Sequence, residues 1–192
     1  DDIRRFAKEI HKNSSRLLTL INDIIRLSEL DATDMSHAFE SINLYPIVEA
    51  CVNMLQINAE KHKVSITFEG KNAEVMSTKE MMEELVYNLC DNAIRYNNEN
   101  GMVHVSLVEE ADKVVLSVKD TGIGIPKDHQ ERVFERFYRV DKSRYKSTGG
   151  TGLGLAIVKH IVVQSNAEIA LQSEKGSGTE IKIIFPKIKE KE

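Results

Sequence analysis

The sequence predicts an α+β fold, with helices on one face of a mostly antiparallel sheet and one long helix ahead of it. Apolar residues recur at helical spacing in some segments and alternate in short segments elsewhere. These segments do not follow a regular strand–helix–strand rhythm, which argues against a parallel sheet. The chain has 192 residues, of which 41% are hydrophobic, so it can bury one core and still carry an appendage.

Residues 1–30 are expected to form one helix, because their apolar side chains occupy the a and d positions of four heptads. These residues are Ile3, Phe6, Ile10, Leu17, Leu20, Ile24 and Leu27. The helix could lie on its own domain, but so long a stripe favours membership of a helical bundle. Residues 31–37 are polar and aperiodic, which predicts a linker. We therefore divide the chain into a bundle helix with its linker, 1–37, and a compact domain, 38–192.

The compact domain is expected to contain three further helices and several short strands. Ser41–Leu44 resembles a short strand, and Pro46 suits the first turn of a helix that runs to about His62. The other segments are a strand at 64–68, a helix at 77–96, a hairpin at 103–107 and 114–118, a loop-rich stretch at 120–152, a helix at 153–164 and strands at 169–171 and 181–185.

Composition excludes several functional classes. With 26 Lys and Arg against 30 Asp and Glu, the net charge of −4 provides no general basic field, so nucleic acid is not an expected partner. Cys51 and Cys90 lie in apolar helical segments without the spacing of a disulfide framework or a zinc site, which fits a reducing compartment. No apolar run approaches the ~18 residues of a membrane span. The start at Asp1 resembles neither a signal peptide nor a native N-terminus, so we expect a fragment of a longer protein.

Six of the ten glycines lie in two loop clusters. Gly122 and Gly124 form the first, and Gly149, Gly150, Gly152 and Gly154 form the second. The second cluster opens directly into an apolar helix, so its bare N–H groups and the positive end of the helix dipole predict an anion site, most simply for phosphate. It is neither a Walker loop nor a Rossmann fingerprint. A purely structural turn is the alternative.

A polar stripe on the helix at 77–96 points to a metal ion. Glu84, Asn88 and Asn92 are spaced by four residues, and Arg95 and Tyr96 follow one turn later. Asparagine costs a helix roughly 0.5 kcal/mol relative to alanine, so two of them in mid-helix suggest a function. The asparagine carbonyl suits Mg²⁺, which shares its coordination shell with nucleotide phosphates. The alternative is an ordinary solvated helix face.

The loop-rich stretch contains two further candidate features. Asp120 stands at the end of a strand, where its carboxylate would accept a hydrogen bond from the exocyclic amine of adenine and repel guanine. The alternative is an Asx-type turn before Gly122. Residues 134–146 combine aromatic side chains with Arg139, Lys142, Arg144 and Lys146, as expected of a lid that serves a polyphosphate. A plain surface loop would explain each part separately.

Five motifs in order resemble those of bacterial sensor histidine kinases. Residues 88–96 resemble the N box, 120–125 the G1 box, 134–138 the F box and 150–155 the G2 box, and 176–179 are similar to the last glycine box. The resemblance implies the Bergerat ATP-binding fold, an α/β sandwich on a mixed sheet that is shared with gyrase, Hsp90 and MutL. Residues 1–30 resemble the second helix of a HisKA-type dimerisation and phosphotransfer bundle.

The resemblance also implies a role for each matching residue. ATP and Mg²⁺ are the implied ligands, with Asn92 as the metal ligand and Asn88 beside it. Arg95 stands where the family usually has lysine, and Asn92, Arg95, Lys142 and Arg144 would serve the transfer step. Asp120 would select adenine. The implied nucleotide-binding residues are Asn88, Asn92, Arg95, Tyr96, Asp120, Gly122, Ile123, Gly124, Ile125, Arg139, Gly150, Thr151, Gly152, Leu153, Gly154, Leu155 and Thr179.

One motif of the family is missing, because none of the six histidines is followed by Glu/Asp-x-Arg/Lys-x-Pro. We therefore expect the phosphoacceptor histidine on an upstream bundle helix, in the same chain or in its partner in a homodimer. The expected function is transfer of the γ-phosphoryl of ATP to that histidine, for relay to a response regulator. The expected location is a cytoplasmic domain of a protein anchored in the plasma membrane by upstream segments.

Two other functions compete with this hypothesis. One is an ATP-hydrolysing conformational switch of the Hsp90 or MutL kind. Asn88 disfavours it, because hydrolytic members usually have glutamate at that position. The other is a degenerate kinase that acts as a scaffold, which the intact motifs disfavour.

Overall fold

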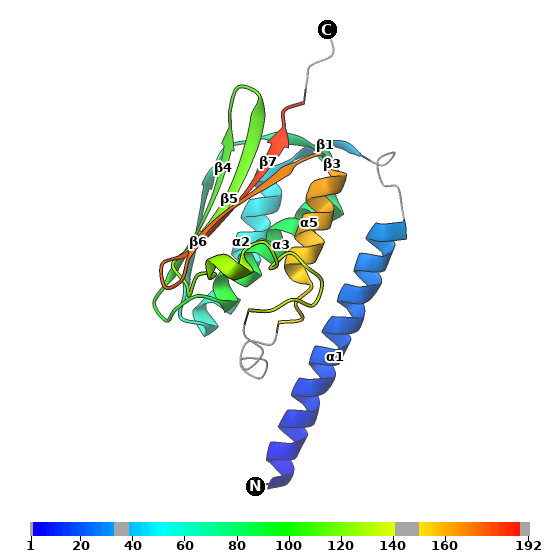
Figure 1. The fold of residues 1–192 in the computed structure, drawn as a ribbon, viewed down its shortest axis with the longest axis vertical. Helices are drawn as coiled ribbons and strands as arrows, with labels where there is room; N and C mark the ends of the chain where they lie inside the picture. Colours follow the sequence, from blue (N-terminus) through cyan, green and yellow to red (C-terminus); the bar gives the residue numbers. More distant parts are fainter. Residues whose placement is uncertain (1, 33–38, 141–149, 189–192) are drawn as a thin grey trace.

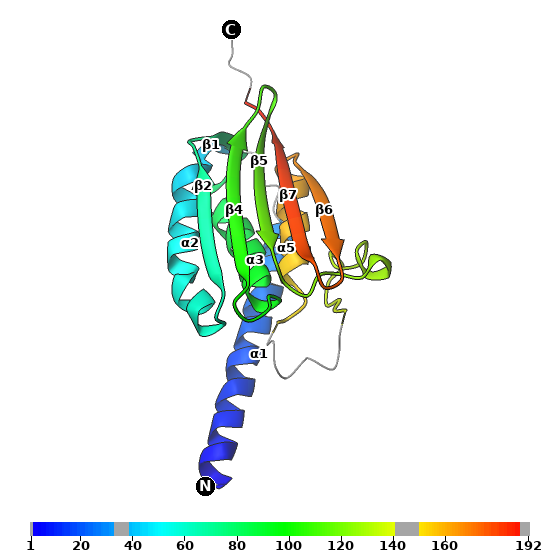
Figure 2. The same cartoon turned by 90° about the vertical axis from the view of Figure 1, so that its left-hand side faces the viewer.

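A computed structural model describes residues 2–32, 39–140 and 150–188 of the chain. One long helix, α1 (Asp2–Ala32), extends from an α/β sandwich (Figure 1). Turning the molecule shows the strands of the main sheet side by side, with the helices of the sandwich behind them (Figure 2). The predicted fold class is therefore confirmed.

The main sheet has the strand order β2-β4-β5-β7-β6. Its strands are β2 (Ser65–Gly70), β4 (Met102–Glu109), β5 (Lys113–Asp120), β6 (Glu168–Glu174) and β7 (Gly178–Pro186). Only β2 and β4 are parallel, and the other neighbouring strands are antiparallel. The predicted hairpin is β4–β5. Its register places Asp120 opposite Val103 on one side and opposite Thr179 of β7 on the other.

Three helices cover one face of this sheet: α2 (Leu44–Lys61), α3 (Lys79–Arg95) and α5 (Gly154–Gln164) (Figures 1 and 2). Their starts follow from local capping. The Asn43 side chain accepts a hydrogen bond from the Tyr45 N–H, and the Thr78 hydroxyl accepts one from the Met81 N–H. Alternate residues of the strands, such as Val103, Val105 and Leu107, are fully buried beneath the helices.

One strand of the fold is not predicted by the sequence. β3 (Glu74–Ser77) pairs with β1 (Glu40–Asn43) in a separate two-stranded sheet, so α3 begins at Lys79 and not at Ser77. Val75 is the only apolar side chain of β3 that is buried, and a four-residue strand gives a weak period-2 signal. The buried Ser77 hydroxyl instead lies 3.2 Å from that of Ser165, which ties β3 to the end of α5.

Helix α1 leaves most of its apolar stripe uncovered within the described part of the chain. Ile3 and Ile10 are 85% and 65% exposed, whereas Leu20 packs against the core of the sandwich. Among the described side chains of α1, Leu20 and Asp23 contact the sandwich, and both lie in the second half of the helix. The bundle interpretation stays a prediction. The linker lies outside the described residues. No helix in the described ranges combines the length and apolar character needed to cross a bilayer.

Candidate functional site

A cavity of about 650 Å³ lies where α3 and the start of α5 meet the end of the sheet. Pockets for small ligands usually measure about 300–1,000 Å³. The sheet contributes Val118, Asp120, Thr179 and Ile181 to its wall. Helix α3, the turn at 123–126 and the segment at 150–155 provide much of the remaining wall. The cavity thus joins segments that are far apart in the sequence.

The asparagine stripe of α3 faces this cavity. Asn88 and Asn92 are half-buried and line the cavity, which favours a binding role over an ordinary solvated helix face. The Asn88 Nδ2 donates to the backbone carbonyl of Glu84 at 2.9 Å, which turns its Oδ1 away from the helix. A Cβ built on Gly154 would lie 2.7 Å from that Oδ1. The carboxamides of α3 therefore directly face the start of α5.

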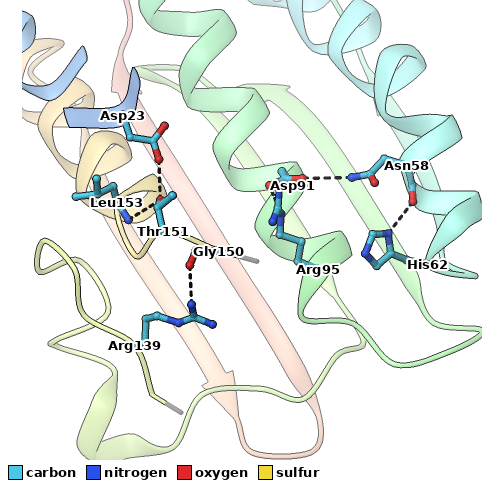
Figure 3. A network of polar contacts seen from close by, with 9 residues as sticks. All are labelled: Asp23, Asn58, His62, Asp91, Arg95, Arg139, Gly150, Thr151 and Leu153. Carbon is cyan, nitrogen blue, oxygen red and sulfur yellow. Dashed lines mark hydrogen bonds and ion pairs between the residues drawn. The ribbon is translucent and has the colours of Figure 1, made fainter. Parts of the chain in front are cut away.

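The start of α5 presents backbone N–H groups without a side-chain cap. Leu153 holds the cap position and makes no capping hydrogen bond, so the first-turn N–H groups of the helix remain available at the cavity. The preceding turn is held by two side chains (Figure 3). Arg139 Nη1 donates to the Gly150 carbonyl at 2.6 Å, and the Thr151 hydroxyl accepts the Leu153 N–H at 3.3 Å. This geometry fits the predicted anion site.

Asp120 carries an unusual carboxyl group. Its Oδ1 accepts the Gly122 N–H at 2.8 Å and the Thr179 N–H at 3.2 Å, so the Asx-turn alternative is correct for this oxygen. Oδ2 has no hydrogen-bond partner among the described residues. Burial raises the pKa of Asp120 to about 6, and the two backbone N–H donors partly oppose that shift. A half-buried, polarised acceptor thus lies in the cavity wall.

Arg95 belongs to a charged network that runs from the cavity wall on α3 to α2. Its Nε donates to Asp91 Oδ2 at 2.5 Å, and Asp91 Oδ1 accepts Asn58 Nδ2 at 3.2 Å (Figure 3). His62 lies against the Asn58 carbonyl, with its Nδ1 2.8 Å away. Arg95 and Asp91 line the cavity, so a cation and its carboxylate partner sit together at its rim.

The first glycine cluster docks onto the turn between β6 and β7. The Gly176 N–H donates to the Ile123 carbonyl at 2.8 Å. Gly124 adopts φ +63°, and a Cβ there would lie 1.9 Å from the Glu174 carbonyl oxygen. Only glycine fits this close backbone approach.

We expect Gly124→Ala to destabilise the protein by about 1–3 kcal/mol more than Gly176→Ala. Gly176 has a similar positive φ of +88°, but a Cβ there would meet no heavy atom within 4 Å, so it reports the cost of the conformation alone. Urea denaturation of both variants measures the difference. Equal losses of stability would show that the close approach at Glu174 does not constrain residue 124.

The structure brings most of the expected nucleotide-binding residues to the cavity wall. Those that line it are Asn88, Asn92, Arg95, Tyr96, Asp120, Ile123, Gly124, Ile125, Arg139, Gly150, Thr151, Gly152, Gly154, Leu155 and Thr179. Gly122 and Leu153 do not. Gly122 is buried, and a Cβ there would lie 2.3 Å from the Tyr96 carbonyl oxygen, whereas the Leu153 side chain packs in the core. Lys142 and Arg144 lie outside the described residues.

The cavity also has lining residues that the sequence analysis missed. Thr19 and Asp23 come from α1, His129 precedes the F-box segment, and Tyr138 is the last residue of that segment. The His129 Nδ1 and the Tyr138 hydroxyl are hydrogen-bonded to each other, and the Arg132 guanidinium lies over the Tyr138 ring, 4.3 Å from its centroid. The helical period of 1–30 placed Asp23 on α1, but no sequence signal related α1 to residue 151.

These features define a class of protein: an α/β sandwich with a cavity between helix carboxamides and a glycine-rich helix start. The sequence profile of the family described as histidine kinase-, DNA gyrase B-, and HSP90-like ATPase matches residues 77–189. The chain belongs to this family, which confirms the resemblance drawn from the motifs.

Individual relatives are sensor kinases. The chain is 37% identical over 187 residues to the sensor-like histidine kinase SenX3 of Mycolicibacterium smegmatis, covering 97% of this chain and 49% of that protein. It thus spans about half the length of this relative. Full-length histidine kinase ShkA, solved in complex with AMPPNP, superposes with a TM-score of 0.81 at 22% identity and covers 98% of this chain and 40% of that one. Histidine kinase ThkA, solved with the response regulator TrrA, superposes with a TM-score of 0.74 at 21% identity, covering 98% and 52%. Both structural matches confirm the fold.

Proposed function

We propose that this chain is the catalytic part of a sensor histidine kinase, which binds Mg·ATP and passes the γ-phosphoryl to a histidine on a bundle helix. The observation that carries the proposal is the close approach of Asn88 to Gly154 in one cavity. A Cβ built on Gly154 would lie 2.7 Å from the Asn88 Oδ1. A carboxamide ligand for a divalent cation and bare N–H donors for phosphate thus face the same space.

The residues at the two sides of the cavity divide the work of binding. Asp120 Oδ2 would accept the adenine amine, with Ile123 and Ile125 as apolar neighbours. The N–H groups at Gly152 and Gly154 would meet the phosphates, and Arg95 and Arg139 would add charge. Asn92 would hold Mg²⁺, with Asn88 beside it. The Asn92 carboxamide fits that role because it has no hydrogen-bond partner among the described residues. Bound Mg²⁺ would neutralise phosphate charge.

In the transfer step this domain serves mainly to align the phosphates of ATP with the incoming histidine. The bond from the γ-phosphorus to the bridging oxygen breaks, a bond to a histidine ring nitrogen forms, and ADP leaves with the electron pair. The domain holds the phosphates in place while the incoming histidine lies on a bundle helix of the same chain or of a second protomer. A response regulator would then accept the phosphoryl group. In this proposal the domain works in the cytoplasm, and any membrane anchor belongs to other segments of the parent protein.

Asn88 separates this proposal from an ATP-hydrolysing switch. Water attack needs a group that accepts a proton, and a carboxamide is a poor base. Glu84, one turn earlier on α3, is absent from the described cavity wall. Steady-state ATP turnover is therefore expected to be slow, and fast turnover would favour the hydrolytic alternative.

We expect the 192-residue chain to bind ATP and yet to label itself poorly. None of its histidines has the sequence context of a phosphoacceptor. Incubation with γ-labelled ATP and Mg²⁺, followed by acid and alkali treatment, measures the acid-labile phosphoryl group. Calorimetry on the same sample verifies binding. Strong acid-labile labelling of this chain would show that one of its own histidines accepts the phosphoryl group.

A further inference from the structure

Helix α1 reaches the candidate nucleotide cavity through one carboxylate. Thr19 and Asp23 line the cavity together with the residues of α3 and the glycine-rich turn. The Thr151 hydroxyl donates to Asp23 Oδ2 at 2.7 Å, across 128 positions of sequence (Figure 3). Asp23 is half-buried, so this contact is partly shielded from water. The long helix thus touches the site at the turn that is expected to meet the phosphates.

The contact constrains the turn as well as the helix. The same hydroxyl that donates to Asp23 accepts the Leu153 N–H at 3.3 Å, so this N–H points at a side chain and not into the cavity. Asp23 therefore fixes the rotamer of Thr151, and Thr151 occupies one backbone donor just before α5. Two consecutive hydrogen bonds, Asp23–Thr151 and Thr151–Leu153, thus connect α1 to the start of α5 (Figure 3).

The charge of Asp23 opposes an anionic ligand. Burial raises the pKa of Asp23, while the Thr151 hydrogen bond and the positive charge of Arg95 lower it and the negative charge of Asp91 raises it. Arg95 is already paired with Asp91. Asp23 adds a second carboxylate near this cation, and so reduces the positive potential at the place where a polyphosphate would bind.

We propose that Asp23 is a brake on nucleotide binding: while α1 lies against the sandwich, its carboxylate holds Thr151 and repels the polyphosphate. This proposal rests on the proposed function. Movement of α1 away from the cavity removes the negative charge and frees the Thr151 hydroxyl to donate a hydrogen bond elsewhere. A displacement of the long helix thereby becomes a change in ATP affinity.

The test compares ATP with adenosine, which shares the base but carries no phosphate. Asp23→Asn removes the charge and keeps an oxygen that can accept from Thr151. We expect ATP to bind about three- to tenfold more tightly to this variant than to the unaltered chain, because one repulsive charge is lost at short range. Adenosine affinity should be unchanged, and the gain for ATP should shrink at high salt. Calorimetry measures ATP binding, and ligand-observed NMR measures adenosine binding.

Glu9→Gln is the matched control, because it removes one negative charge from an exposed position of α1 outside the cavity wall. It should leave ATP affinity unchanged. Unchanged or weaker ATP binding by Asp23→Asn would overturn the brake, as would an equal gain for adenosine. Failure of the unaltered chain to bind ATP would instead refute the proposed function. The two failures are thus distinguishable, and adenosine binding by the variant verifies that its site is folded.

Discussion

Replacement of Asn92 by alanine is expected to weaken magnesium-dependent ATP binding by about 100-fold, because a metal site with few protein ligands loses one of them. The variant should still fold. Alanine is the better helix former by roughly 0.5 kcal/mol, so α3 should become slightly more stable. Calorimetry with ATP in excess Mg²⁺, and again in EDTA, separates the metal-dependent part of the affinity. Urea denaturation measures the stability of the ligand-free chain.

Asn53→Ala is the matched control for this experiment. Asn53 lies exposed on α2, away from the cavity wall, and its substitution also removes one carboxamide from a helix. It should gain similar helix stability and keep its affinity for Mg·ATP. If Asn92→Ala binds ATP as tightly as this control, with the same response to EDTA, then Asn92 is not the metal ligand and α3 needs another explanation for its polar stripe.

The parts of the fold that sequence predicts well are those with strong periodicity. Alternation identified the β4–β5 hairpin because half of its side chains, such as Val105 and Leu116, must enter the core. The helix at 153–164 was located within one residue, because the glycine cluster ends where its apolar run begins. Strand β3 is not predicted because four residues with one buried apolar side chain, Val75, give too short an alternation, and its pairing with β1 is long-range.

The candidate site was predictable where function imposes unusual residues on ordinary elements. Two asparagines in mid-helix and a strand that ends in aspartate conflict with local propensity, and the structure places both in one cavity. Long-range contacts were not predictable in this way. Nothing in the sequence related Asp23 to Thr151, because a hydrogen bond between α1 and a distant turn depends on how the long helix packs against the sandwich.

Asp120 combines a proposed binding role with a cost in stability. An ordinary aspartate is ionised well below neutral pH, but burial raises the pKa of Asp120 to about 6 in the folded protein. Its contribution to stability is therefore fully present below the unfolded pKa, near 3.8, and is lost as the pH rises through about 6. At neutral pH the folded protein carries a partly buried negative charge. That charge is the acceptor that the adenine amine would need.

Asp120→Asn is therefore expected to raise stability and abolish most binding. At pH 7.5 the ligand-free variant should be more stable by about 1–2 kcal/mol, because asparagine keeps an oxygen for the Gly122 and Thr179 N–H groups without the buried charge. ATP affinity should fall by about 100-fold, since the adenine amine loses its charged acceptor. Urea denaturation and calorimetry measure the two effects.

The pH dependence of the unaltered chain tests the same carboxyl group without a mutation. ATP affinity should decline as the pH falls through about 6, because protonation removes the acceptor, and Asp120→Asn should flatten that decline. Guanine nucleotides supply the opposite check, since guanine presents an oxygen where adenine presents its amine. The unaltered chain should reject GTP, and the variant, whose amide can donate, should discriminate less. A variant that still prefers ATP as strongly, with the same decline at acidic pH, would show that adenine is selected elsewhere in the cavity.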